Sequence, residues 1–319
     1  MRAAVNTRCA RSKGESRTYS IIRILRGALS APRGILQQVC RDFPVSLSVT
    51  TEKMIHPGMI RSVWAYRGFI TGSVKREFQS KYRNSILGAA WTVLQPLAMI
   101  LVYTVIFSQV MSAKLPGVDS SFAYSIYLCA GVLTWGLFAE ITSRGQNVFL
   151  EHANLIKKLS FPRICLPIIV ILNAGLNFAI IFALFVCFLL ATGHFPGWVF
   201  LGMLPILAVQ VAFSIGLGIT LGVLNVFFRD VGQFFTILLQ FWFWFTPIVY
   251  PPTILPENIR PFLAWNPMAS VISAYQQILV NGQWPQWSSL LPAAAIGVGL
   301  CVFGMRLFRK RAGEMVDEL

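Results

Sequence analysis

Residue types that do chemistry are sparse in this sequence, and the common catalytic spacings are absent from it. No G-x-x-x-x-G-K-[ST] segment occurs, which excludes ATP binding by a P-loop. No H-E-x-x-H, G-x-S-x-G or C-x-x-C motif occurs either. Two carboxylates, Asp119 and Glu257, lie on separate predicted loops. A glycosyl-transfer mechanism that needs two neighbouring carboxylates therefore has thin support.

An unbroken aromatic run, Phe241 to Phe245, is the most unusual feature among the apolar segments. Five consecutive side chains point all round a helix, so lipid cannot be the neighbour of all of them. Aromatic belts at membrane interfaces are common, whereas aromatic faces also suit the apolar faces of sugar rings. Both interpretations, a membrane belt and a surface that faces a sugar chain, stay open at this point.

Glu140 is the main ionisable residue inside the predicted membrane spans. A charge at the bilayer centre costs about 2.5–3.5 kcal/mol on insertion scales, and less near the end of a span. Glu140 lies near one end of its span, so it either faces the bundle interior or reaches the headgroups. One isolated carboxylate makes a poor proton relay.

Long apolar stretches surround these residues and predict an all-α membrane protein. About 20 apolar residues cross the hydrocarbon as a helix, and backbone in lipid must satisfy its own hydrogen bonds. We expect six transmembrane helices, near 87–111, 123–142, 164–191, 199–226, 231–250 and 288–308. The Pro-rich segment 251–287 is too interrupted to cross, which predicts short re-entrant or interfacial helices.

Basic residues gather on one side of these predicted spans. They are Arg144, Lys157, Lys158, Arg163, Arg229, Arg306, Arg309, Lys310 and Arg311, against only Lys114 and Arg260 on the other side. The positive-inside rule then predicts that both termini are cytoplasmic. The polar connection 143–163 lies on this side, and it predicts a short helix that ends before Pro162.

Composition separates the membrane domain from its flanks. Charged residues make up 12% of the chain, against about 25% in a soluble domain, and the net charge is +15. We expect a basic, disordered extension at 1–60, an amphipathic interface helix at 61–86, the six-helix domain at 87–308 and a cytoplasmic tail at 309–319. The basic excess fits anionic headgroups better than nucleic acid. The six cysteines are expected to be free thiols, with no metal site.

From about residue 60 onward the chain resembles the ABC-2 family of transport permeases. Within that family it is most similar to exporters of O-antigen, capsule or teichoic acid, mainly because of its aromatic fifth span. The matching stretches are RNSILGAAWTVLQPL at 83–97, NLIKKLSFPR at 154–163, FRDVGQ at 228–233, FTPIVY at 245–250 and WNPM at 265–268.

The resemblance implies a homodimer that pairs with two copies of a separate ATPase subunit in a bacterial inner membrane. ATP and Mg would be bound by that partner, and no cofactor by this chain. The family's coupling loop corresponds here to Glu151, Asn154, Lys157, Lys158 and Phe161, and the interface helix would also lie on the ATPase side. The 251–287 segment corresponds to short periplasmic helices of the family.

The leading hypothesis is ATP-driven export of a lipid-linked polysaccharide through a conduit inside the dimer. Its candidate lining residues are Tyr103, Trp135, Trp242, Trp244 and Tyr250. One alternative is an ABC-2 exporter of small hydrophobic molecules or lipids, which needs no sugar-sized aromatic conduit. Alternatives from other classes are a membrane enzyme that transfers glycans, and a membrane scaffold without transport.

Overall fold

The computed structural model describes residues 64–82, 90–106, 122–158, 162–258 and 260–319, and the predicted extension at 1–60 lies outside them. Every regular element among these residues is helical, so the all-α prediction is confirmed for this part of the chain. The helices are α4 (Arg67–Tyr82), α5 (Trp91–Tyr103), α6 (Ala123–Glu151), α7 (Ala153–Lys158), α8 (Cys165–Ala191), η3 (Gly197–Gly202), α9 (Met203–Phe227), α10 (Asp230–Phe245), η4 (Pro252–Ile254), α11 (Arg260–Leu263), α12 (Pro267–Asn281), α13 (Trp287–Arg311) and α14 (Glu314–Glu318).

Four helical segments in the described part of the chain are long and apolar enough to cross a membrane. They are α6, α8, the continuous segment of η3 and α9, and α13. Three of them begin and end within a few residues of the spans predicted at 164–191, 199–226 and 288–308. The prediction for α6 was wrong at its C-terminal end, because the helix continues from residue 142 to Glu151.

The two other predicted spans are shorter helices in the structure. α5 has 13 residues inside the predicted range 87–111. Residues 87–89 and 107–111 of that range lie outside the described part. α10 has 16 residues and ends at Phe245, before the predicted end at 250. Pro247 explains this end, since proline biases the preceding residue away from helical backbone. Thr246 is extended, with φ −103° and ψ 134°. The six-span count stays a prediction.

Between 251 and 287 the structure has short helices, as predicted. The longest, α12, has Pro267 at its first position, and the side chain of Asn266 accepts a hydrogen bond from the N–H of Met268 at 3.1 Å. It ends at Gly282, whose φ of +62° favours glycine. α12 packs against α6, α9 and α13, and Ile272, Tyr275 and Ile278 are buried there.

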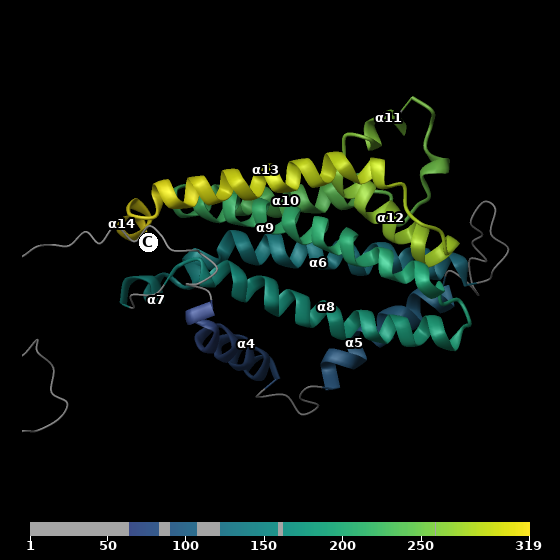
Figure 1. Cartoon of the computed structure of the whole chain (residues 1–319), viewed down its shortest axis with the longest axis horizontal. Coiled ribbons are helices and arrows are strands. Elements are labelled where there is room, and N and C mark those ends of the chain that lie inside the picture. The colour runs from purple at the N-terminus through teal and green to yellow at the C-terminus, as the bar shows by residue number, and fades with distance from the viewer. Residues whose placement is uncertain (1–63, 83–89, 107–121, 159–161, 259) are drawn as a thin grey trace, which may run out of the picture. The chain divides into compact units, whose positions relative to one another are not determined.

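α9 is the central helix of the bundle, with α6 on one side and α13 on another (Figure 1). Glycines allow these helices to approach closely. A Cβ placed on Gly145 would lie 2.9 Å from the Cα of Gly218, and one on Gly222 would lie 2.6 Å from the carbonyl oxygen of Gly145. Similarly, a Cβ on Gly216 would lie 2.6 Å from the backbone nitrogen of Cys301. Small residues at such crossings are typical of membrane helix packing.

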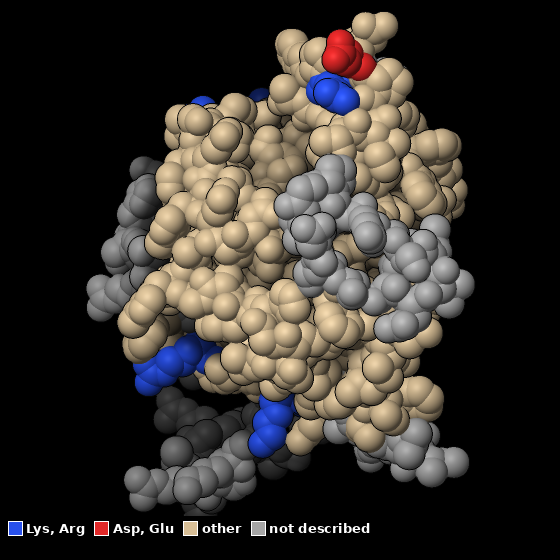
Figure 2. Space-filling view, turned by 90° about the vertical axis from the view of Figure 1, so that its right-hand side faces the viewer, with Lys and Arg blue, Asp and Glu red and all other residues tan. Residues whose placement is uncertain are grey.

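The two ends of the bundle differ in charge. Figure 2 looks onto the end that carries α11 and α12, and charged atoms cover little of the described surface in that view. At the other end, α13 finishes with Arg309, Lys310 and Arg311, and α7 and α14 lie there as well (Figure 1).

Candidate functional site

Trp135 and Trp242 pack against each other inside the subunit. Trp135, on α6, is 7% exposed. Its ring centroid lies 6.3 Å from that of Trp242, edge to face, and Phe138 lies 5.3 Å from Trp242 in the same way. The indole N–H of Trp242 donates to the side-chain oxygen of Asn266 at 2.9 Å, which anchors the end of α10 to the start of α12.

The opposite side of α10 is exposed and aromatic. We call it the aromatic face of α10, and its members are Phe234, Ile237, Phe241, Trp244 and Phe245. Trp244 is 63% exposed, and its carbonyl accepts a hydrogen bond from the Tyr250 hydroxyl at 2.8 Å. Gln233 and Gln240 are also exposed on this helix. An apolar surface of this kind faces lipid, a second subunit or a substrate.

The five predicted lining residues therefore have different surroundings. Trp135 is buried, and Trp242 and Tyr103 are partly buried against interior clusters. Tyr250 is half-buried, and Trp244 is exposed. Of the five, Trp244 has the most exposed side chain. Their role in a conduit stays a prediction.

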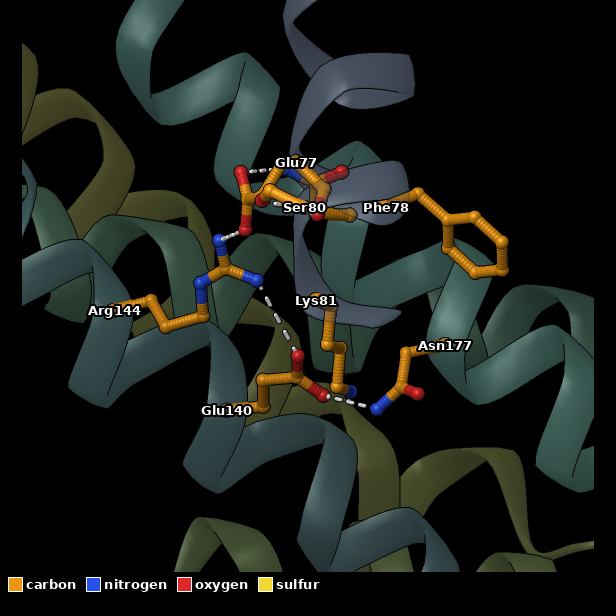
Figure 3. Close-up of a pocket in the computed structure, with 8 residues that line it drawn as sticks. Glu77, Phe78, Ser80, Lys81, Glu140, Arg144 and Asn177 are labelled. Atoms are coloured by element: carbon orange, nitrogen blue, oxygen red, sulfur yellow. Dashed lines mark hydrogen bonds and ion pairs between the residues drawn. The ribbon is translucent and has the colours of Figure 1, made fainter. Parts of the chain in front are cut away.

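A polar pocket of about 380 Å³ lies between α4, α6 and α8 (Figure 3). Eight residues line it, namely Glu77, Phe78, Ser80, Lys81, Glu140, Arg144, Asn173 and Asn177. Glu140 is one helical turn from Arg144 on α6, and their side chains form an ion pair at 3.5 Å. Glu140 thus has a charged partner in the bundle, where the sequence alone suggested an isolated carboxylate.

Arg144 joins three helices through this pocket. Its guanidinium also forms an ion pair with Glu77 of α4, and Glu77 accepts a hydrogen bond from Asn173 of α8. Asn177 of α8 donates to Glu140 at 2.9 Å, and Figure 3 shows Lys81 pointing toward the same carboxylate. The network therefore ties α4 to the bundle at the level of α6.

Apolar contacts hold the other end of α4 against α8. Ile70 is 4% exposed and packs in a cluster with Cys165 and Ile169. Trp64, just before α4, is exposed, and the guanidinium of Arg67 lies 5.0 Å from its ring centroid.

The predicted coupling residues lie around α7. One residue, His152, separates the end of α6 at Glu151 from the start of α7 at Ala153. Glu151, Asn154 and Lys157 are exposed, whereas Ile156 is buried. The Lys158 side chain and Phe161 lie outside what the structure describes. The predicted short helix before Pro162 is confirmed.

Comparison with known proteins identifies the family. Residues 70–280 match the family described as ABC-2 type transporter. The chain belongs to this family. The O-antigen export system permease protein RfbA of Myxococcus xanthus is 31% identical to it over 263 residues, which cover 82% of this chain and 99% of the relative. RfbA of Klebsiella pneumoniae is 31% identical over 237 residues, covering 74% and 88%. The polysialic acid transport protein KpsM of Escherichia coli is 23% identical over 246 residues, covering 76% and 92%.

This ABC-2 chain is therefore a multi-pass membrane permease. Among its pocket residues, Glu77, Asn173 and Asn177 were not singled out from the sequence, and Arg144 was noted there only as a basic residue beside a span. One signal was present for two of them: Asn173 and Asn177 are one turn apart in an otherwise apolar helix. Glu77 gave no comparable signal, because its partners depend on how α4 docks.

Proposed function

We propose that this chain is the permease subunit of an exporter that carries a polysaccharide across a bacterial inner membrane. The observation that carries the proposal is the match to the Myxococcus xanthus O-antigen export permease, which extends over 99% of that protein. The polysialic acid transport protein is similar over most of its length as well. The shared task of these relatives is glycan export, and the substrate proposed here is a lipid-linked polysaccharide.

Energy for export would come from ATP and Mg bound by a separate ATPase subunit, in two copies beside a permease dimer. The exposed side chains of Glu151, Asn154 and Lys157 support a docking surface at α7. Lys158 and Phe161 stay predicted members of it. ATP binding would draw two ATPase subunits together, and α7 would pass that movement to α6, of which it is the direct continuation.

The orientation follows from charge. We place the end that carries α7, α14 and the basic end of α13 in the cytoplasm, and the sparsely charged end in Figure 2 outside. Both termini would then be cytoplasmic, with α4 as the interface helix of the 61–86 segment. The six-helix domain at 87–308 stays our proposal, with α5 and α10 as parts of its first and fifth spans.

A polar polymer cannot cross hydrocarbon, so it needs a conduit. Trp135 and Trp242 fill the interior of the subunit. The conduit would therefore form where two subunits meet. The aromatic face of α10 is the surface that we assign to it, with Trp244 beside Gln233 and Gln240. Aromatic rings and amide groups together offer a sugar chain both apolar contacts and hydrogen bonds.

Replacing Lys157 with glutamate should weaken binding of the ATPase subunit about tenfold, because an attractive charge at the interface becomes repulsive. Copurification from membranes measures this. Lys310→Glu is the matched control, since it makes the same charge change at an exposed site on α13. The docking role of α7 would be contradicted if the Lys157 variant bound the ATPase subunit normally, or if both variants lost the same amount of binding.

Replacing Trp244 with leucine should slow polysaccharide export about twofold to twelvefold, the factor that corresponds to about 0.5–1.5 kcal/mol of lost aromatic contact. Trp198→Leu is the control, because Trp198 is also highly exposed but lies on η3. Export is measured as polymer that reaches the outer side of the membrane. Full export by the Trp244 variant would favour the alternative substrate class, small hydrophobic molecules.

A further inference from the structure

The C-terminal segment is packed against the bundle. The segment predicted as a cytoplasmic tail, 309–319, contains the end of α13 at Arg311 and the short helix α14 at Glu314–Glu318. The side chain of Met315, in the first turn of α14, is 1% exposed. Nearly complete burial of a side chain on a helix of five residues indicates a specific contact.

That contact includes α7. α14 touches both α7 and α9, and Met315 belongs to the same buried cluster as Ile156 of α7 and Val226 of α9. Phe308, near the end of α13, belongs to this cluster too and stacks on Phe149 of α6 at 5.4 Å. The cluster therefore joins the ends of α6, α9 and α13 to α7 and α14.

A polar contact holds the same region. The guanidinium of Arg163, in the connection between α7 and α8, donates to the carbonyl of Ala312 between α13 and α14. Partial burial lowers the pKa of Arg163 from its ordinary value, but at neutral pH the group stays charged. The chain just before α14 is thus held near the segment that follows α7.

α7 needs such support. It has six residues, and an isolated helix of that length does not form in water, because nucleation is costly and few hydrogen bonds follow it. Its stability must come from packing, and Ile156 of α7 is buried. Met315 is buried in the cluster that encloses Ile156.

We propose that α14 holds α7 in the position in which α7 meets the ATPase subunit, and that Met315 is a positioning residue for this contact. The proposal rests on the proposed function, in which α7 is the docking segment. In this arrangement α14 determines how firmly movement of the ATPase subunit is transmitted through α7 to α6.

Hydrogen exchange in the assembled permease and ATPase complex, held in lipid nanodiscs, tests this proposal. In Met315→Ala the backbone amides of α7 should exchange at least about tenfold faster than in the natural protein, and the ATPase subunit should bind several-fold more weakly. Met315→Leu, which restores apolar volume, should return both quantities close to their natural values. Asp317→Ala is the control, because Asp317 is exposed on the same helix.

Unchanged exchange of α7 in Met315→Ala would overturn the proposal, as would faster exchange with unchanged ATPase binding. If Met315→Ala does not accumulate in the membrane, Arg163→Gln performs the same test, since it removes the charged donor to Ala312 without emptying the buried cluster. Lys157→Glu separates the two proposals. It should weaken ATPase binding while α7 exchanges normally, and its failure would contradict the docking surface but leave the exchange result on α14 intact.

Discussion

Replacing Gly222 with alanine should sharply lower the thermal stability of the permease. A Cβ at this position would lie 2.6 Å from the carbonyl oxygen of Gly145 and 3.2 Å from the ring of Phe149. The oxygen belongs to the backbone of α6, so α6 and α9 must move apart. Overpacking of this kind costs about 1–3 kcal/mol or more, and it would displace the glycine-lined crossing at the centre of the bundle.

Thermal unfolding of the detergent-solubilised protein, followed by size exclusion, measures this effect. Gly136→Ala in α6 and Gly299→Ala in α13 are the controls, because a Cβ at either site meets no atom within 4 Å. These two variants should be as stable as the natural protein or slightly more so, because alanine favours a helix. Equal stability of Gly222→Ala and the two controls would contradict the close approach of α6 and α9.

Loss of Arg144 should release α4 from the bundle and reduce export severely. Arg144 bridges Glu77 of α4 and Glu140 of α6, and all three side chains are between 26% and 41% exposed. Removing one partner of a fully buried pair costs about 3–5 kcal/mol, and we expect about 1–3 kcal/mol for this partly hydrated one. Arg144→Glu should lower stability and export more than Arg144→Ala, since it places a third carboxylate beside those of Glu77 and Glu140.

The exchanged pair, Glu77→Arg with Arg144→Glu, provides the decisive comparison. It restores opposite charges across the boundary between α4 and α6, so stability and export should recover in part relative to Arg144→Glu alone. Protease accessibility of α4 and the rate of export are the two measurements. Purely additive losses in the double variant would show that the ion pair does not hold α4.

The long apolar helices were predictable from the sequence, whereas the end of α6 was not. Residues 143–151 are polar and suggested a loop. They are helical because neighbouring helices satisfy them: the amide of Gln146 donates to the carbonyl of Gly232 at 3.3 Å, and Asn225 donates to the carbonyl of Gln146 at 3.0 Å. Hydropathy cannot distinguish polar groups paired inside a bundle from polar groups in water.

The position of the aromatic run could be predicted from the sequence, but the direction in which each of its side chains points could not. The aromatic run of α10 was evident, yet the exposure of Trp244 and the burial of Trp242 follow from contacts with α6 and α12. The pairing of Glu77 with Arg144 joins residues far apart in the chain, and it depends on where α4 docks. The burial of Met315 likewise depends on the tertiary contact between α14 and α7.

Reconstituted transport tests the central claim most directly. The permease and its ATPase subunit are placed in proteoliposomes with a lipid-linked polysaccharide, and polymer on the opposite side is measured after ATP and Mg²⁺ are added. We predict translocation that requires both subunits and ATP, with no ATP hydrolysis by the permease alone. Hydrolysis by the isolated permease, or translocation without the ATPase subunit, would contradict the account.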